Sequence, residues 1–240
     1  NQYFGVRTAQ EKVKRREGGI IWHTQGSGKS LTMVWLAKWI RENIKNARVL
    51  LITDRTELDE QIEKVFKGVD EGIHRAGSGA DLVRALNDGE EWLIGSLIQK
   101  FGGSEEGDVD AYLEDLERHL PKGFYPKGEI FVFVDECHRT QSGKLHAAMK
   151  ALLPGALMIG FTGTPLLKKD KRKSIEVFGP YIHTYKYDEA VRDGVVLDLR
   201  YEARDIDQHI TSQAKIDQWF DLKTRGLSDL AKAQLKQRWG

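Results

Sequence analysis

The sequence has few of the residues on which several classes of protein depend. Its 240 residues include one cysteine, Cys137, which excludes an internal disulfide framework and a cysteine-based metal cluster. A single cysteine fits the reducing cytoplasm, where we expect the protein to be located. The longest apolar runs, at 130–134 and 156–161, have the length of strands and fall far short of a membrane span. An initiator Met and a signal peptide are also missing, so we expect a piece of a longer protein that is not secreted.

An excess of charge of either sign is also missing. The 37 Lys and Arg residues nearly balance the 36 Asp and Glu residues, so any contact with nucleic acid must come from local patches. The composition is otherwise that of a folded protein, because 40% of the residues are hydrophobic and six Trp, nine Phe and seven Tyr are present. A disordered chain is therefore excluded, and the length allows one or two domains.

Short apolar segments alternate with helical patterns through most of the chain. Strands are predicted at 20–22, 48–53, 92–94, 130–134 and 157–161, and helices at 31–40, 58–66 and 144–153. Strands that alternate with helices form a parallel sheet that is covered on both faces. We therefore predict an α/β domain over 1–200, with a weakly ordered loop insertion at 102–128. The segment 201–240 is predicted to be a linker followed by amphipathic helices that begin a further region.

A glycine-rich loop follows the first predicted strand. Residues 24–30 are Thr-Gln-Gly-Ser-Gly-Lys-Ser, and a predicted helix comes next. Glycines let backbone N–H groups turn toward phosphates, and the helix N-terminus adds partial positive charge. Lys29 would then reach the β- and γ-phosphates of ATP, and Ser30 would offer its hydroxyl to Mg²⁺. The segment predicts a P-loop although His23 occupies a consensus glycine position, and the alternative is a chance glycine turn before a helix.

Two acidic residues follow the fourth predicted strand. Asp135 and Glu136 come directly after the apolar run 131–134. A strand end that points at the phosphate site would place Asp135 to hold Mg²⁺ and Glu136 to accept a proton from the attacking water. The alternative is an exposed acidic strand terminus. His138, taken alone, would be a structural histidine.

These segments together resemble a known family. Residues 135–138, Asp-Glu-Cys-His, and residues 162–165, Thr-Gly-Thr-Pro, resemble motifs II and III of superfamily 2 helicases and translocases. The combination of 22–30, 53–61 and 135–141 is narrower. It closely resembles the motor part of the restriction (R) subunit of type I restriction-modification enzymes.

The resemblance runs from about residue 2 to residue 202, and in this family a histidine at position 23 is ordinary. It implies a RecA-like P-loop NTPase domain over 1–200, with a mostly parallel sheet, helices on both faces and a short helical tail after it. This domain would be the first of two motor domains.

The resemblance also implies a role for each matching residue. ATP would be bound by Gln2, which reads the adenine, and by Thr24, Gln25, Gly26, Ser27, Gly28, Lys29 and Ser30. The metal would be bound by Ser30 and Asp135, and the catalytic residues would be Glu136, Asp135 and Lys29. The nucleotide would be coupled to DNA movement by His138, Thr162 and Thr164. DNA contacts are implied for Thr53, Arg55, Gln99 and Lys100, and a basic run suggests Lys168 and Lys169. Solvated loops are the alternative for these last six residues.

The family implies an ATP-driven double-stranded DNA translocase within a larger enzyme. The implied partners are double-stranded DNA, methyltransferase and specificity subunits, and the second RecA-like domain and nuclease domain of the same subunit, with no membrane. No motif with the arginines of the second RecA-like domain follows Tyr201, so we expect these 240 residues alone to hydrolyse ATP barely. The alternatives are a superfamily 2 DNA or RNA helicase of another system and a nucleotide-binding interaction module.

Overall fold

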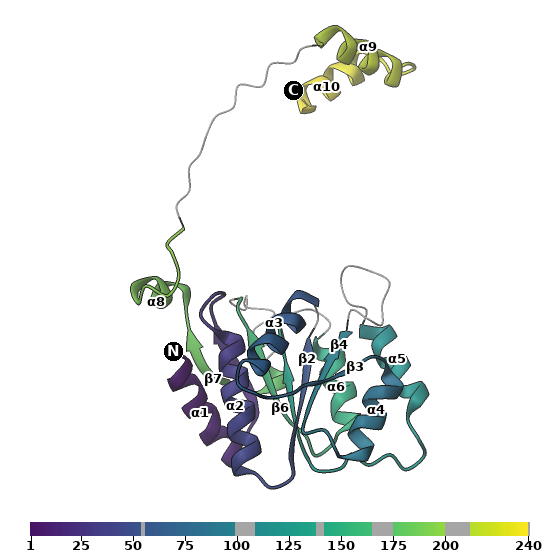
Figure 1. Ribbon diagram of the computed structural model, residues 1–240. Coiled ribbons are helices and arrows are strands. Elements are labelled where there is room, and N and C mark those ends of the chain that lie inside the picture. The colour runs from purple at the N-terminus through teal and green to yellow at the C-terminus, as the bar shows by residue number, and fades with distance from the viewer. Residues whose placement is uncertain (54–55, 99–108, 138–141, 165–174, 200–211, 240) are drawn as a thin grey trace. The chain divides into compact units, whose positions relative to one another are not determined.

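A seven-stranded parallel sheet lies at the centre of the first part of the chain (Figure 1). The structure is a computed structural model that describes residues 1–53, 56–98, 109–137, 142–164, 175–199 and 212–239. The chain divides into two compact units, Asn1–Asp198 and Leu199–Gly240. The sheet belongs to the first unit.

The strand order of the sheet is β3-β4-β2-β5-β6-β1-β7, and every neighbouring pair is parallel. The strands are β1 Gly19–His23, β2 Ala47–Thr53, β3 His74–Ala76, β4 Leu93–Leu97, β5 Glu129–Val134, β6 Leu157–Thr162 and β7 Tyr181–Tyr185. The helices of this unit for which the structure gives bounds are α1 Gln2–Lys14, α2 Lys29–Asn43, α3 Thr56–Lys67, α4 Gly79–Asp88, α5 Val109–His119, α6 Ser142–Leu152 and α8 Tyr187–Arg192. The predicted α/β class with a parallel sheet is confirmed.

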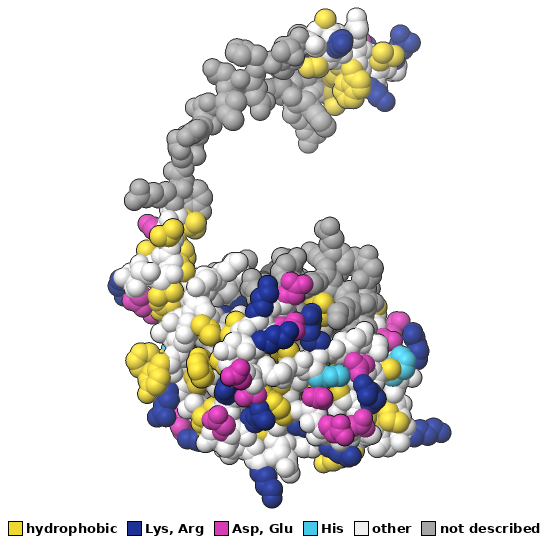
Figure 2. Space-filling view, viewed as in Figure 1, with side chains coloured by type: hydrophobic (Ala, Val, Ile, Leu, Met, Phe, Trp, Pro, Cys, Tyr) yellow, Lys and Arg dark blue, Asp and Glu magenta, His cyan; other side chains and the backbone are white. Residues whose placement is uncertain are grey.

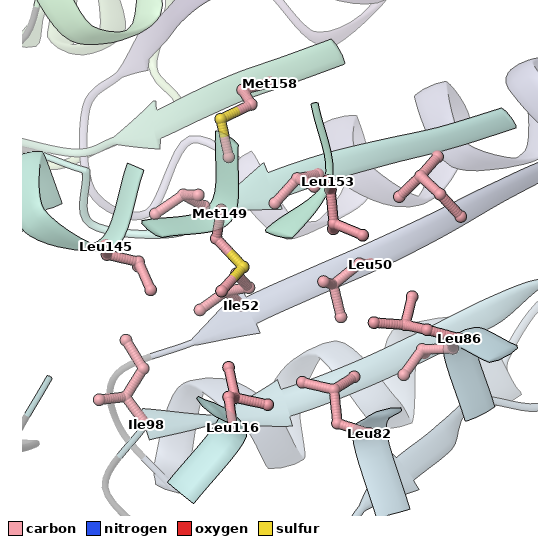
Figure 3. Close-up of a cluster of buried hydrophobic side chains, with 14 of the residues drawn as sticks. Leu50, Ile52, Leu82, Leu86, Ile98, Leu116, Leu145, Met149, Leu153 and Met158 are labelled. Atoms are coloured by element: carbon pink, nitrogen blue, oxygen red, sulfur yellow. The ribbon is translucent and has the colours of Figure 1, made fainter. Parts of the chain in front are cut away.

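Helices cover both faces of the sheet. All seven residues of β2 are buried, and because successive side chains of a strand point to opposite faces, they divide between two cores. Leu50 and Ile52 join one cluster with residues of α4, α5 and α6, as Figure 3 shows. Val49 and Leu51 join the other cluster with residues of α1, α2 and α3. The predicted two-sided cover is confirmed.

A buried arginine fastens α4 to the sheet. Arg48 on β2 is 4% exposed, and its guanidinium donates hydrogen bonds to four backbone carbonyls. The acceptors are the oxygens of Ala85 at 2.6 Å, Leu86 at 2.8 Å, Glu91 at 2.7 Å and Lys127 at 3.0 Å. Two of them belong to the last turn of α4, where the N–H of Gly89 also donates to Ala85 at 3.4 Å and the N–H of Lys127 to Leu86 at 3.1 Å. Arg48 therefore caps this helix from the strand.

The prediction of a weakly ordered loop at 102–128 is wrong for part of that segment. Residues 109–119 form α5, and Leu116 on this helix is 2% exposed in the core with α4. The helix is held because its apolar side chains cover the sheet, a tertiary contact that the acidic and glycine-rich start of the segment does not reveal. Residues 99–108 lie outside the described residues.

The second unit contains two helices, α9 Gln213–Lys223 and α10 Asp229–Trp239. Within it, the ammonium of Lys236 lies 5.1 Å from the centre of the Phe220 ring. Ile216, Trp219 and Leu230 are 45–75% exposed, and this unit shows apolar surface in Figure 2. The predicted linker falls mostly on 200–211, outside the described residues. In the part of the chain that the structure describes, no helix is long and apolar enough to span a membrane.

Candidate active site

The candidate site lies at the carboxyl ends of three adjacent strands. In the sheet, β6 lies between β5 and β1. The glycine-rich loop leaves β1, the acidic pair leaves β5, and Thr162 ends β6. Ligands of open α/β sheets bind outside the carboxyl ends of the strands. The topology therefore brings the two predicted motifs, which are about a hundred residues apart, to one edge of the sheet.

The loop has the backbone that a phosphate cradle requires. Gly26 and Gly28 have φ angles of 81° and 85°, a left-handed conformation that side chains disfavour. Ser27 donates from both its backbone N–H, at 3.2 Å, and its hydroxyl, at 2.6 Å, to the carbonyl of Thr24. Gly28 is the N-cap of α2, so Lys29 and Ser30 open the helix. The loop therefore ends at the positive end of a helix dipole, where anions bind favourably.

The first helix contacts this loop. The amide of Asn1 donates to the carbonyl oxygen of Ser27 at 2.8 Å, and the amide of Gln2 donates to the same oxygen at 3.2 Å. A Cβ on Gly28 would lie 1.9 Å from Nε2 of Gln2, so the close approach depends on glycine. The N-terminal end of α1, which includes Gln2, is therefore packed against the P-loop.

Three charged side chains meet at the centre of the site. The ammonium of Lys29 lies 3.0 Å from Oδ1 of Asp135 and 2.6 Å from Oε1 of Glu136. The side chains of Lys29, Asp135 and Glu136 are 13%, 3% and 20% exposed. Burial would lower the pKa of Lys29, but the two carboxylates outweigh it and raise the pKa, so the lysine stays charged. Burial raises the pKa of Asp135, and the Lys29 charge opposes that shift.

The turn that carries the acidic pair is strained. Glu136 has a φ of 47°, in the left-handed region that non-glycine residues rarely occupy. Its N–H donates to Oδ1 of Asp135 at 3.0 Å, and the N–H of Asp135 donates to the carbonyl of Ile52 on β2 at 2.9 Å. Residues held in this region cost of order 1–3 kcal/mol and gather at functional sites. Here the conformation turns the Glu136 carboxylate toward Lys29.

Cys137 joins the acidic turn to β6. Its N–H donates to the carbonyl of Phe161 at 3.0 Å, and its side chain is fully buried. A Cβ on Gly160 would lie 2.6 Å from Sγ of Cys137, so the thiol fills space that the glycine leaves. Burial raises the pKa of this thiol, which fits a packing role. Beyond it, Thr162 is buried, and its hydroxyl accepts from the N–H of Thr164 at 3.1 Å.

The remaining predicted residues have different outcomes. The exposed Gln25 and Gly26 lie on the loop. Thr53 is 1% exposed at the end of β2, so the predicted DNA contact would require this strand end to move. Arg55, Gln99, Lys100, His138, Lys168 and Lys169 lie outside the described residues. On the face in Figure 2, basic and acidic side chains are mixed, as the balanced net charge predicts.

The oxygen atoms at the site suit a magnesium ion whose other ligands are phosphate oxygens and water. Among the described residues, no group of three or more His, Cys, Asp or Glu could hold a metal ion. Ser30 and Asp135 supply a hydroxyl and a carboxylate, the oxygen donors that Mg²⁺ prefers when substrate phosphates and water complete its shell. The residues therefore fit magnesium bound together with a nucleotide.

One contact at the site was missed by sequence reasoning. His23, at the end of β1, lies 2.9 Å from His183 on β7, measured from Nε2 to Nδ1. The N–H of Thr24 donates to the carbonyl of Tyr185, also on β7, at 2.9 Å. The histidine in place of a consensus glycine was the signal that could have pointed to this contact, but its partner is 160 residues away.

Comparisons with known proteins show the family of this chain. The family model for the SWI2/SNF2 ATPase matches residues 1–233. A putative type I restriction enzyme MjaIXP endonuclease subunit from Methanocaldococcus jannaschii is 36% identical over 213 residues, which cover 88% of this chain and 19% of that protein. The type I restriction enzyme HindI endonuclease subunit from Haemophilus influenzae is 33% identical over 229 residues, covering 84% of this chain and 20% of the relative.

Solved structures share the fold. The Sulfolobus solfataricus SWI2/SNF2 ATPase core in complex with double-stranded DNA matches with a TM-score of 0.53 and 16% identity, over 80% of this chain and 37% of that one. The ATP-dependent Type ISP restriction-modification enzyme LlaBIII bound to DNA matches with a TM-score of 0.54 and 15% identity, over 80% of this chain and 15% of that one. The chain spans about a fifth of the length of its curated relatives. It belongs to the SWI2/SNF2 ATPase family and is homologous to the ATPase region of type I restriction enzyme endonuclease subunits.

Proposed function

We propose that this chain binds and hydrolyses Mg-ATP to move double-stranded DNA as the first motor domain of a type I restriction enzyme R subunit. The observation that carries the proposal is the cluster of Lys29, Asp135 and Glu136 beside the glycine-rich loop. A lysine, a metal-binding acid and a second acid at one sheet edge are the groups that phosphoryl transfer to water requires. A module that only bound nucleotide would not need the second acid.

In this proposal Lys29 binds the phosphates and Glu136 is the general base. Without a nucleotide, the ammonium of Lys29 forms ion pairs with both carboxylates. When its ammonium binds the β- and γ-phosphates, Lys29 no longer holds the Glu136 carboxylate, which can accept a proton from the attacking water. Binding of the substrate would therefore remove the lysine contact from the general base.

The residues proposed for magnesium are Ser30 and Asp135. When bound, Mg²⁺ would neutralise charge on the phosphates. Asp135 is suited to hold a cation because its buried carboxylate already lies 3.0 Å from the ammonium of Lys29. Gln2 would read the adenine from the end of α1, where its amide already contacts the loop.

The test is to separate nucleotide binding from turnover in the full-length subunit. Glu136→Gln should leave Mg-ATP affinity nearly unchanged and slow DNA-stimulated hydrolysis by about 10² or more, the usual effect of losing a general base. Affinity is measured by titration with a fluorescent ATP analogue, and turnover by phosphate release. Glu114→Gln is the control, because it removes an exposed acidic side chain from α5, outside the acidic turn, and should change neither quantity. Equal turnover in Glu136→Gln and the parent would remove Glu136 from its proposed role.

DNA movement is proposed from the proteins to which this chain is similar. Two solved structures with this fold are complexes with DNA, which is double-stranded in one of them. The proposed partners are therefore double-stranded DNA, the methyltransferase and specificity subunits, and the second RecA-like and nuclease domains of the same subunit. We propose contacts through Thr53, Arg55, Gln99, Lys100, Lys168 and Lys169, and coupling of the nucleotide to DNA through His138, Thr162 and Thr164.

Two measurements test the DNA part. Neutralising Lys168 and Lys169 in the full-length subunit should flatten the salt dependence of DNA binding. With fewer phosphate contacts, binding releases fewer counterions from the DNA. An unchanged slope would make this run a solvated loop. A helicase of another system would instead unwind forked DNA, whereas a double-stranded translocase should leave the strands paired.

A further inference from the structure

The root of the glycine-rich loop is held by β7, the last strand of the sheet. His183 on β7 is in register with Ile21 on β1, and its ring reaches diagonally to His23, with 2.9 Å between Nδ1 and Nε2. One loop residue further on, the N–H of Thr24 donates to the carbonyl of Tyr185 at 2.9 Å. The loop therefore begins at a backbone and a side-chain contact with the same strand.

The ring of His23 also fills the space between β1 and α1. His23 is fully buried. A Cβ added to Gly5 of α1 would lie 2.8 Å from Cε1 and 3.0 Å from Nε2 of His23. Real Cβ atoms essentially never approach so closely, so α1 can lie at this distance only because residue 5 is glycine. The histidine that replaces a consensus glycine in the loop is thus accommodated by a glycine in the helix.

The surroundings of the two rings indicate which of their nitrogens carry protons. Nδ1 of His23 is buried and has no hydrogen-bond partner in the described part of the chain. An N–H there would be an unsatisfied buried donor, which costs more than an unused lone pair on a weak acceptor. Nε2 of His23 therefore carries the proton and donates to Nδ1 of His183. Burial lowers the pKa of both histidines, which keeps both rings neutral.

The same helix contacts the loop at a second place. Asn1 and Gln2, at the start of α1, donate to the carbonyl of Ser27 near the tip of the loop. Gly5 lies one helical turn further along and rests on His23 at the root. A shift of the His23 ring would therefore displace both the loop and the end of the helix that carries Gln2.

We propose that the His23–His183 pair, covered by Gly5, positions the glycine-rich loop and Gln2 for nucleotide binding. His23 and His183 are positioning residues in this inference, since they act on the nucleotide through the loop and α1. The inference rests on the proposed function. It adds that affinity for ATP, and preference for its base, depend on a contact with the last strand of the sheet.

The test compares two substitutions on β7 in the full-length subunit. His183→Ala removes the acceptor and should raise the Kd for Mg-ATP about tenfold, the equivalent of one lost hydrogen bond. It should also reduce the preference for ATP over GTP, because Gln2 shifts. Ile182→Ala is the matched control, since Ile182 is buried in the core on the same strand and its aliphatic side chain forms no hydrogen bond. The control should lower the melting temperature at least as much and change Kd by less than about twofold.

Two further variants identify the contact itself. His183→Asn places an amide oxygen near the position of Nδ1 and should restore most of the ATP affinity lost in His183→Ala. Gly5→Ala favours the helix by intrinsic propensity, yet it should weaken ATP binding because its methyl group pushes the His23 ring. The same substitution in a His23→Gly background should cause no additional loss, because the ring is gone.

The outcomes distinguish this inference from the proposed function. Equal losses of affinity in His183→Ala and Ile182→Ala, no recovery in His183→Asn, or unchanged binding in Gly5→Ala would each overturn the positioning role while leaving the ATPase intact. A parent subunit that bound no Mg-ATP would overturn the proposed function and this inference together. An unchanged preference for ATP over GTP alongside a weakened Kd would overturn the placement of Gln2.

Discussion

Replacing Lys29 with methionine should affect stability and ATP binding for different reasons. Lys29→Met keeps most of the side-chain volume but removes the charge that lies 3.0 Å from Asp135 and 2.6 Å from Glu136. Two carboxylates would then remain together, one of them on a side chain only 3% exposed. Breaking a buried ion pair from one side costs about 3–5 kcal/mol, because the remaining charge is left uncompensated. At about 2–4 °C per kcal/mol, the melting temperature should fall by roughly 6–20 °C.

The same substitution should weaken ATP binding. A charge-assisted hydrogen bond to phosphate contributes about 1.5–3 kcal/mol, which corresponds to roughly a 10- to 150-fold higher Kd. The unneutralised carboxylates would also repel the phosphates, so the loss should lie toward the upper end of that range. Thermal unfolding without nucleotide and titration with a fluorescent ATP analogue measure the two effects separately.

A second substitution separates the two roles of Lys29. Asp135→Asn in the Lys29→Met background removes one of the two like charges, so it should recover about half or more of the lost stability. The contact between the ammonium and the phosphates stays lost, so the Kd for ATP should remain at least about tenfold above that of the parent. An unchanged melting temperature in Lys29→Met would refute the charge cluster as described. Recovery of the parent's ATP affinity in the double variant would refute the contact between Lys29 and the phosphates.

Three other predictions concern the scaffold around the site. Arg48→Leu should destabilise the chain by about 3–5 kcal/mol in urea unfolding, because buried carbonyls lose a charged donor, and a loss below about 1 kcal/mol would contradict its capping role. Gly128→Ala should cost more than about 1 kcal/mol, because Gly128 has a φ of 84° and the new Cβ would lie 2.6 Å from the carbonyl oxygen of Asn46; unchanged stability would show that this turn can relax. Burial lowers the pKa of His23 to about 3. As the pH falls below about 6.5, the unfolded chain therefore binds a proton at this histidine and the folded chain does not. The free energy of unfolding should therefore decline, relative to His23→Asn, by up to about 1.4 kcal/mol per pH unit between about pH 6.5 and 3, and parallel pH profiles of the two proteins would show that His23 takes up a proton in the folded state.

The elements that sequence reasoning recovered are those defined by local patterns. The buried strands 48–53 and 130–134 are continuous apolar runs of strand length, as expected when both faces of a parallel sheet are covered. The segment 24–30 is recognisable because its glycines, lysine and serine stand together between a strand and a helix. The acidic pair at the end of the fourth predicted strand follows from the same kind of short-range signal.

Elements that depend on distant partners were not predicted. The short β3 and the edge strand β7 contain few strongly apolar residues, so their conformation depends on pairing with β4 and β1. The helix α5 begins after a glycine-rich and acidic segment, and only its packing in the core with α4 shows that it is part of the domain. The left-handed backbone of Glu136 is likewise invisible in the residue types alone.

The residue types alone define the class of fold, the glycine-rich loop and the two acidic residues, because each depends on neighbours within a few positions. The tertiary structure decided that β1, β6 and β5 lie side by side, which brings Lys29 to Asp135 and Glu136. It also decided that His23 meets His183 across 160 positions of the chain. Such contacts follow from the order of strands in the sheet and the docking of helices on it, and no local pattern encodes either.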